Sequence, residues 1–194
     1  GVLYLNTPNT YGGPTTVGTG TLFVVNSSGS ATGSGVLTVS SGATLAGPGL
    51  VGGAVTNHGF VSPEGFNGIP FGTLTLLDGY SQSQSGTLMI EIGSASELDE
   101  LAVTGAASLA GTLDVTLLNG YQPSAGDTFT VLNASSITGT FDTTNLPALA
   151  GGLAWQVAYL TGHVQLQVGP ACSADIDSDG DYSNGLTPDG GIDI

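Results

Sequence analysis

The sequence predicts an all-β protein, most consistent with a parallel β-solenoid, and three observations carry this prediction. Short apolar runs of strand length recur along the chain, bounded by Gly, Asn or Ser. Several of these runs begin with the same Gly-Thr-Leu triplet, which makes an irregular internal repeat. No window shows the helical spacing of apolar residues, and the frequent glycine and β-branched residues disfavour a helix throughout.

The predicted solenoid occupies residues 1–115. Its clearest strands are residues 20–25, 35–39, 42–45, 72–76, 86–90 and 111–115. Repeated short strands without intervening helices are typical of a solenoid, in which each coil buries its inward side chains on the next coil. A Greek-key β-sandwich is the alternative.

The pattern changes over residues 116–168. A turn at residues 121–127 leads into an apolar run at residues 128–132. Apolar residues then alternate with smaller or polar ones over residues 153–159 and 164–168, with Thr161-Gly162 between the two runs. This alternation predicts an antiparallel hairpin with one buried face. We expect the hairpin to cap the solenoid, whose last coil would otherwise expose an apolar face and an open edge.

Residues 169–194 form a third region, which is acidic, small and rich in turn residues. Six of the fifteen carboxylates of the chain fall in its last twenty residues: Asp175, Asp177, Asp179, Asp181, Asp189 and Asp193. Cys172 is the only cysteine, so no disulfide forms within the chain. The thiol is either unpaired or pairs outside this chain.

The charge balance excludes several classes of function. The 194 residues include no lysine or arginine but fifteen aspartates and glutamates. The groups that bind phosphates are absent, which argues against nucleic-acid or nucleotide partners and against anionic membrane surfaces. A carboxylate here is neutralised only by a proton, a hydrogen-bond donor or a metal cation. We therefore expect a secreted protein in a medium rich in divalent cations.

No membrane-spanning segment is expected, because the chain has no apolar run of about twenty residues. The sequence begins at Gly1 without a methionine or a signal sequence, which predicts a mature, processed or truncated chain.

The first 17 residues, with Asn9-Thr10-Tyr11-Gly12-Gly13-Pro14-Thr15 at their centre, resemble the passenger-associated transport repeat of bacterial autotransporters. The triplet Gly20-Thr21-Leu22 follows where that family has its next strand, and residues 99–105 and 111–113 look like the end of such passengers. The resemblance covers roughly residues 1–168. It implies a right-handed parallel β-helix exported to the cell surface. No membrane-barrel domain follows in this sequence.

The segment 175–181 resembles a dockerin or EF-hand calcium loop, of the kind that ends many surface proteins of planctomycete-like bacteria. Asp175, Asp177 and Asp179 occupy loop positions 1, 3 and 5, and Gly180 occupies position 6. Leu186 stands where the loop needs a bidentate acid, and Asp189 and Asp193 would complete the ligand shell. The resemblance implies a Ca²⁺ site formed by the six tail aspartates. A disordered acidic tail is the alternative.

Other motifs do not predict a catalytic site. Residues 47–52 match a dinucleotide fingerprint as a string, but no helix is expected after them, so we interpret them as a turn. His58 and His163 have no zinc-ligand spacing with other residues. Glu97, Asp99 and Glu100 are adjacent in sequence, whereas glycosidic cleavage uses two carboxylates across a cleft. We therefore predict that the protein is not an enzyme.

These observations predict an extracellular structural protein that assembles with itself into a surface filament or matrix stabilised by Ca²⁺. Solenoid ends have open strand edges that pair with another chain, and a polyanion repels itself unless counter-ions lie between its copies. The alternative is a cell-surface adhesin that presents a repetitive Thr, Ser and Asn face to glycans.

Overall fold

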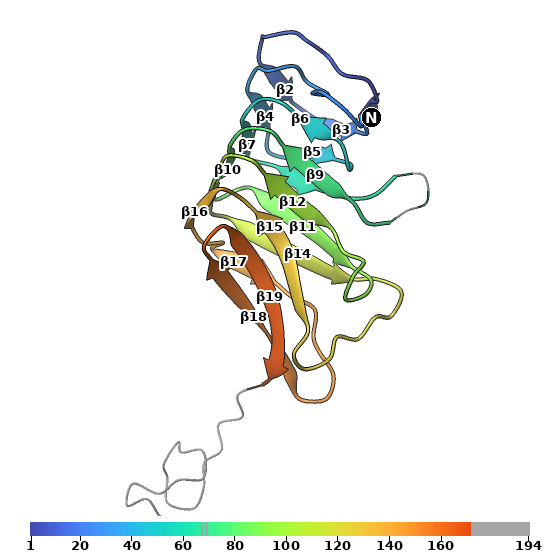
Figure 1. Ribbon diagram of the computed structural model, residues 1–194, viewed down its shortest axis with the longest axis vertical. Coiled ribbons are helices and arrows are strands. Elements are labelled where there is room, and N and C mark those ends of the chain that lie inside the picture. The colour runs from blue at the N-terminus through green and yellow to red at the C-terminus, as the bar shows by residue number, and fades with distance from the viewer. Residues whose placement is uncertain (67, 69, 172–194) are drawn as a thin grey trace, which may run out of the picture.

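The computed structural model describes residues 1–66, 68 and 70–171. These residues form nineteen β-strands in three sheets, and no helix occurs among them. The prediction of an all-β protein is therefore confirmed for the described chain. The strands are stacked along the long axis of the molecule, from β1 and β2 at one end to the β17–β19 region at the other (Figure 1).

We call the three sheets A, B and C. Sheet A contains, in spatial order, β1 (Val2–Leu5), β3 (Gly20–Val24), β5 (Ala43–Ala46), β8 (Phe60–Ser62), β11 (Thr87–Ile92), β14 (Thr112–Leu117) and β17 (Thr143–Asn145). Sheet B contains β2 (Thr15–Val17), β4 (Leu37–Val39), β7 (Val55–Asn57), β10 (Tyr80–Gln82), β13 (Ala106–Leu109) and β16 (Ser136–Gly139). Sheet C contains β6 (Leu50–Val51), β9 (Thr73–Leu76), β12 (Glu100–Val103), β15 (Thr128–Asn133), β19 (His163–Pro170) and β18 (Leu153–Leu160).

The chain visits the sheets in a fixed order. From β5 onward, successive strands belong to sheets A, C and B in turn, and each strand pairs in parallel with the strand one circuit later, as far as β17. We call one such circuit a coil. Greek-key sandwiches pair their strands antiparallel. The observed arrangement is instead the parallel, solenoid-like one that the repeated Gly-Thr-Leu strands predicted.

One inward row of side chains shows why these residues form a stack. The register of sheet A places Leu22, Leu45, Val61, Leu88 and Leu113 side by side on successive strands. All five are buried. Neighbouring strands lie about 4.8 Å apart, so each aliphatic side chain packs directly on the next. The hydrophobic core is thus a continuous column of aliphatic side chains. A further coil extends this column only if its sequence places an aliphatic residue at the same inward position.

Tight packing at the corners explains why some strands are shorter than predicted. The run predicted at residues 35–39 begins as a strand only at Leu37. A β-carbon on Gly35 would lie 2.0 Å from the carbonyl oxygen of Gly13 on the neighbouring coil. Glycine is required here because the two backbones meet at the turn, not because a strand begins there.

The interior also holds one polar network, which ties three coils together. The Tyr80 hydroxyl donates to Gln82 Oε1 (2.6 Å), and Asn57 Nδ2 donates to the Tyr80 oxygen (3.1 Å). Gln82 Nε2 donates to the carbonyl oxygens of Ala110 (2.8 Å) and Thr112 (3.0 Å). Buried polar groups that lose such partners cost about 1–3 kcal/mol each, so this network stabilises the corner between sheets B and A.

The predicted hairpin of residues 153–168 is confirmed. Strands β18 and β19 pair antiparallel over eight residues, and β19 pairs antiparallel with β15. The turn between them contains Gly162 with a φ of 82°. Trp155 packs edge-on against Phe129, with ring centroids 5.7 Å apart, which joins the hairpin to the core.

Candidate assembly surface at the N-terminal end

The N-terminal end of the stack has two open strand edges. Among the described residues, β1 is the outermost strand of sheet A and β2 is the outermost strand of sheet B. On its inner side β1 pairs with β3: the carbonyl oxygens of Gly1 and Leu5 accept hydrogen bonds from Thr21 N (3.0 Å) and Val25 N (2.9 Å). Backbone groups of successive strand residues point to opposite sides. Those of Val2 and Tyr4 therefore point to the open side.

The edge of β2 has the same alternation. Thr15 N donates to the Val36 oxygen (2.9 Å), and the Val17 oxygen accepts a hydrogen bond from Ser40 N (3.0 Å). The backbone groups of Thr16, between them, point to the open side. Both edges thus present donors and acceptors without a neighbouring strand, which is the arrangement that templates pairing with another chain.

An open groove of about 380 Å³ lies between the two edges, lined by residues that include Val2, Leu3, Val17 and Leu22. Leu3 is 60 % exposed, and Val2 and Tyr4 are each 55 % exposed, the largest exposed fractions among the large apolar side chains of the described chain. Leu3 lies opposite Leu22 in the register of sheet A, so it belongs to the inward row. The groove is the uncovered end of the hydrophobic column.

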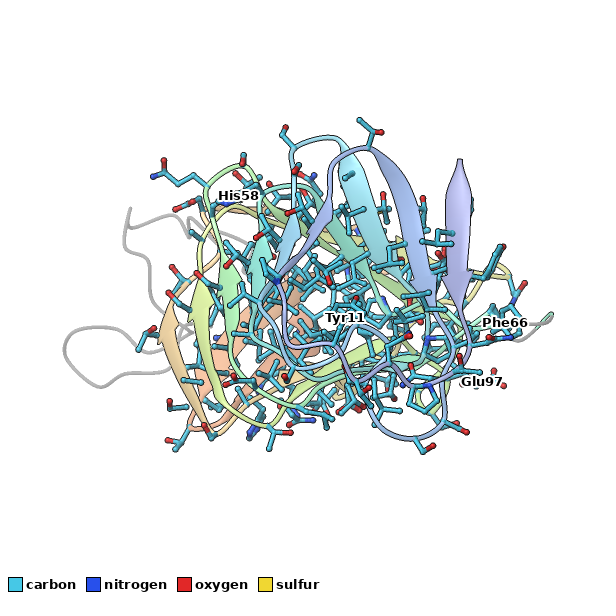
Figure 2. All side chains as sticks on the ribbon, turned by 90° about the horizontal axis from the view of Figure 1, so that it is seen from above. Tyr11, His58, Phe66 and Glu97 are labelled. Carbon is cyan, nitrogen blue, oxygen red and sulfur yellow. The ribbon has the colours of Figure 1, made fainter. Side chains whose placement is uncertain are left out.

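Aromatic residues surround this end. The rings of Tyr4, Phe23 and Phe66 lie with their centroids 5.2–6.2 Å apart, and Tyr4 is 55 % exposed. Figure 2, which looks down on this end, shows Tyr11 over its middle. The Tyr11 hydroxyl lies 2.8 Å from Thr15 Oγ1. The exposed apolar surface therefore extends across the end and onto the outer face of sheet A.

The first strands of the chain, which form this end, carry no ionised side chains. Residues 1–63 contain no Asp, Glu, Lys or Arg, and all fifteen carboxylates lie from Glu64 onward. This segregation was not among the predicted features, although the positions of the acids along the sequence are enough to reveal it. In a chain without lysine or arginine, the N-terminal end is the surface that another copy approaches with the least repulsion between carboxylates.

The carboxylates of Glu64, Glu91 and Asp99 lie near one another in the acidic part. Asp99 is fully buried, and its oxygens accept hydrogen bonds from Gly72 N (2.9 Å) and Glu91 N (3.0 Å). Burial raises the pKa of Asp99 to about 7 despite these two bonds, and repulsion from Glu91 and Glu64 adds to the rise. Burial also raises the pKa of Glu64 and of Glu91.

The acids that were considered as a catalytic pair occupy different environments. Asp99 is buried, Glu97 is exposed on the turn before it, and Glu100 Oε1 accepts a hydrogen bond from Asn133 Nδ2 (2.6 Å). Asp99 joins the strand β11 to the segment before β9, because its carboxylate holds backbone groups of both. This geometry gives Asp99 a structural role.

The six predicted metal ligands all belong to the C-terminal tail. Asp175, Asp177, Asp179, Asp181, Asp189 and Asp193 lie outside the described residues, as does Cys172. Within residues 1–66, 68 and 70–171, no group of three His, Cys, Asp or Glu side chains is placed to hold a metal ion. The described chain also contains no helix long and apolar enough to cross a membrane.

The remaining sequence motifs lie at corners of the stack. The Gly47-Pro48-Gly49 part of the dinucleotide-like string connects β5 to β6, and no helix follows it. His58 Nδ1 lies 2.9 Å from Ser83 Oγ at the corner between sheets B and A.

No protein-family model matches the chain, and no curated protein matches it significantly. The assignment of a function therefore depends on the geometry and charge of the N-terminal end.

Proposed function

We propose that this protein is a structural subunit that associates with itself through the N-terminal end of its solenoid. The observation that carries this proposal is the coincidence of two open strand edges, an apolar groove and a complete lack of ionised side chains at one end. When a second copy covers the exposed side chains of Val2, Leu3 and Tyr4, the burial of their apolar surface stabilises the contact by about 25 cal/mol per Å². Pairing of the strand edges satisfies backbone hydrogen-bond donors and acceptors at the same time.

The opposite end supports the same direction of assembly. There the β18–β19 hairpin extends sheet C, and its Trp155 and Tyr159 side chains pack against Phe129 and Phe141. We assign the hairpin the role of a cap that closes the last coil, within a right-handed helix as the resemblance to autotransporter passengers implies. The hairpin thus covers apolar side chains of the last coil, although β16, β17 and β18 are outermost strands there, whereas the apolar side chains of the first coil are left uncovered.

The wider proposal is an extracellular filament or matrix at the cell surface, without enzymatic activity. Two kinds of link build it. The neutral ends join solenoids, and the six tail aspartates bind Ca²⁺ within or between copies. A divalent cation is the natural counter-ion for a chain that has no lysine or arginine. The protein's principal partner is therefore itself.

Removal of Ca²⁺ by a chelator distinguishes the contact through the N-terminal ends from the contact through the tail aspartates. In Ca²⁺ the purified chain should form particles larger than dimers by sedimentation velocity and negative-stain microscopy. Excess EDTA should remove the larger assemblies and leave the link through the neutral ends, because no carboxylate takes part in it. A chain that stays monomeric at high concentration, with or without Ca²⁺, would contradict the proposed function.

A row of hydroxyl groups favours the adhesin as a second candidate function. The register of sheet B aligns one outward residue per strand, in the order Thr16, Thr38, Thr56, Ser81, Ser108 and Thr138. Hydroxyls repeated about every 4.8 Å suit hydrogen bonding to an extended glycan.

Replacing Thr38 and Thr56 with valine tests that candidate. If the row binds glycan, the double variant should lose retention on a polysaccharide affinity column while its sedimentation stays unchanged. Equal retention of the variant and the parent chain would count against the adhesin.

A further inference from the structure

We infer that two copies join N-terminal end to N-terminal end, through antiparallel pairing of β1 with β1 about a two-fold axis at Leu3. This inference rests on the proposed function and specifies the partner surface. The competing arrangement is head to tail, in which β1 of one copy pairs with β17 of the next.

At the end of the stack opposite to β1, the three sheets end at different levels, which disfavours the head-to-tail arrangement. Strands β14, β15 and β16 form one coil, and after it sheet A gains one strand (β17), sheet C gains two (β19 and β18) and sheet B gains none. A second copy whose β1 pairs with β17 would hold its β2 two strand spacings from β16, which leaves one level of sheet B empty between them. In sheet C, β18 lies two strands beyond β15, so it would overlap with the first coil of this second copy. The two edges of the N-terminal end therefore cannot both pair there.

The backbone of β1 fits antiparallel self-pairing. Its open-side groups belong to Val2 and Tyr4, so Val2 of one copy lies opposite Tyr4 of the other and exchanges two hydrogen bonds with it. The two-fold axis repeats this pair, which gives four bonds. Leu3 then faces Leu3 of the second copy as a non-hydrogen-bonded pair, with Cα atoms about 4.5 Å apart. Because Leu3 belongs to the inward row, the two hydrophobic columns become continuous.

Charge selects the same arrangement. Each copy keeps its fifteen carboxylates from Glu64 onward, so an end-to-end pair places the two neutral segments between the two acidic ones. A head-to-tail contact instead places a neutral end against the acidic half of the next copy, where Asp142 lies just before β17. A symmetric contact of this kind closes on itself, so it produces pairs rather than open chains.

Disulfide trapping tests the arrangement. In a Cys172→Ala background, Leu3→Cys should give a covalent dimer after mild oxidation with copper phenanthroline, because residue 3 meets its own copy at the axis. Leu77→Cys is the collision control, since Leu77 is 43 % exposed on the side of the stack. Thr144→Cys tests the competing arrangement. In a head-to-tail contact the row Leu113–Thr144 continues into the next copy, so residue 144 lies opposite residue 3 only in that arrangement.

The expected result on non-reducing gels is a strong dimer band for Leu3→Cys, none for Leu77→Cys and no ladder for the double variant Leu3→Cys/Thr144→Cys. A ladder in the double variant without dimer in Leu3→Cys would overturn the inference and leave the proposed function standing. Dimer of equal strength in Leu77→Cys would overturn it as well. Absence of any cross-link, together with monomeric sedimentation of the parent chain, would refute the proposed function itself.

Discussion

Replacing Val2 with proline should strongly weaken the association through the N-terminal ends, measured in EDTA, without unfolding the chain. The N–H of Val2 points to the open side of β1, so its loss removes no bond between β1 and β3. In a symmetric pair the substitution counts twice. Two lost hydrogen bonds of about 1 kcal/mol each weaken association by at least about thirtyfold, before the clash of the proline ring is added.

Sedimentation velocity over a range of concentrations measures this effect, and thermal unfolding by circular dichroism reports on the fold. Val2→Thr is the matched control, because threonine keeps the N–H and the β-branched shape and should retain most of the association. If Val2→Pro associated as strongly as the parent chain, the open edge of β1 would not be the contact.

Stability should fall as pH rises from about 4 to about 7, the reverse of the usual acid denaturation. The folded pKa of Asp99 is about 7, above its ordinary value of 3.8, so the folded state holds a proton that the unfolded state releases. The stability that this proton contributes is fully present at pH values below the unfolded pKa of 3.8. It is lost as the pH rises through the folded pKa of about 7. A shift of this size corresponds to on the order of 4 kcal/mol.

No lysine or arginine can relieve this loss, because the chain contains neither. The groups that face Asp99 are Glu91 on β11 and Glu64 after β8, and their own raised pKa values act in the same direction. Urea unfolding at pH values from roughly 3.5 to roughly 8 measures the slope, because this range brackets the window from about pH 4 to about pH 7 in which stability should fall.

Asp99→Asn assigns the slope to this residue. The variant should flatten the pH dependence, although it is less stable than the parent chain at acidic pH, since an amide cannot accept both backbone hydrogen bonds. Glu97→Gln, on the exposed turn, should leave the slope unchanged. A free energy of unfolding that rises with pH over this range would contradict the role given to Asp99.

Much of the fold could be predicted from local pattern. The Gly-Thr-Leu runs predicted the parallel strands because each places one aliphatic side chain inward, and the alternation over residues 153–168 predicted the hairpin. The short strands β6 and β2 could not be recognised, although the equally short β4 lies within the predicted run at residues 35–39. Their pairing partners supply the order that so short a segment lacks on its own.

The candidate surface was less predictable, because it depends on neighbours that are distant in sequence. The burial of the acids shows the same dependence on distant neighbours. Glu97 is exposed whereas Asp99, two residues later, is buried and accepts a hydrogen bond from Gly72 on the neighbouring coil.

The sequence by itself determined the all-β class, the repeated strands, the hairpin and the absence of any cation to neutralise the acids. Only the tertiary structure decided which apolar side chains remain uncovered. Leu3 and Leu22 occupy equivalent places in successive strands, yet Leu3 is 60 % exposed and Leu22 is 4 % exposed. The physical reason is that a side chain in a stack is buried by the coils on both sides of it. A residue in the first coil has a neighbour on one side only.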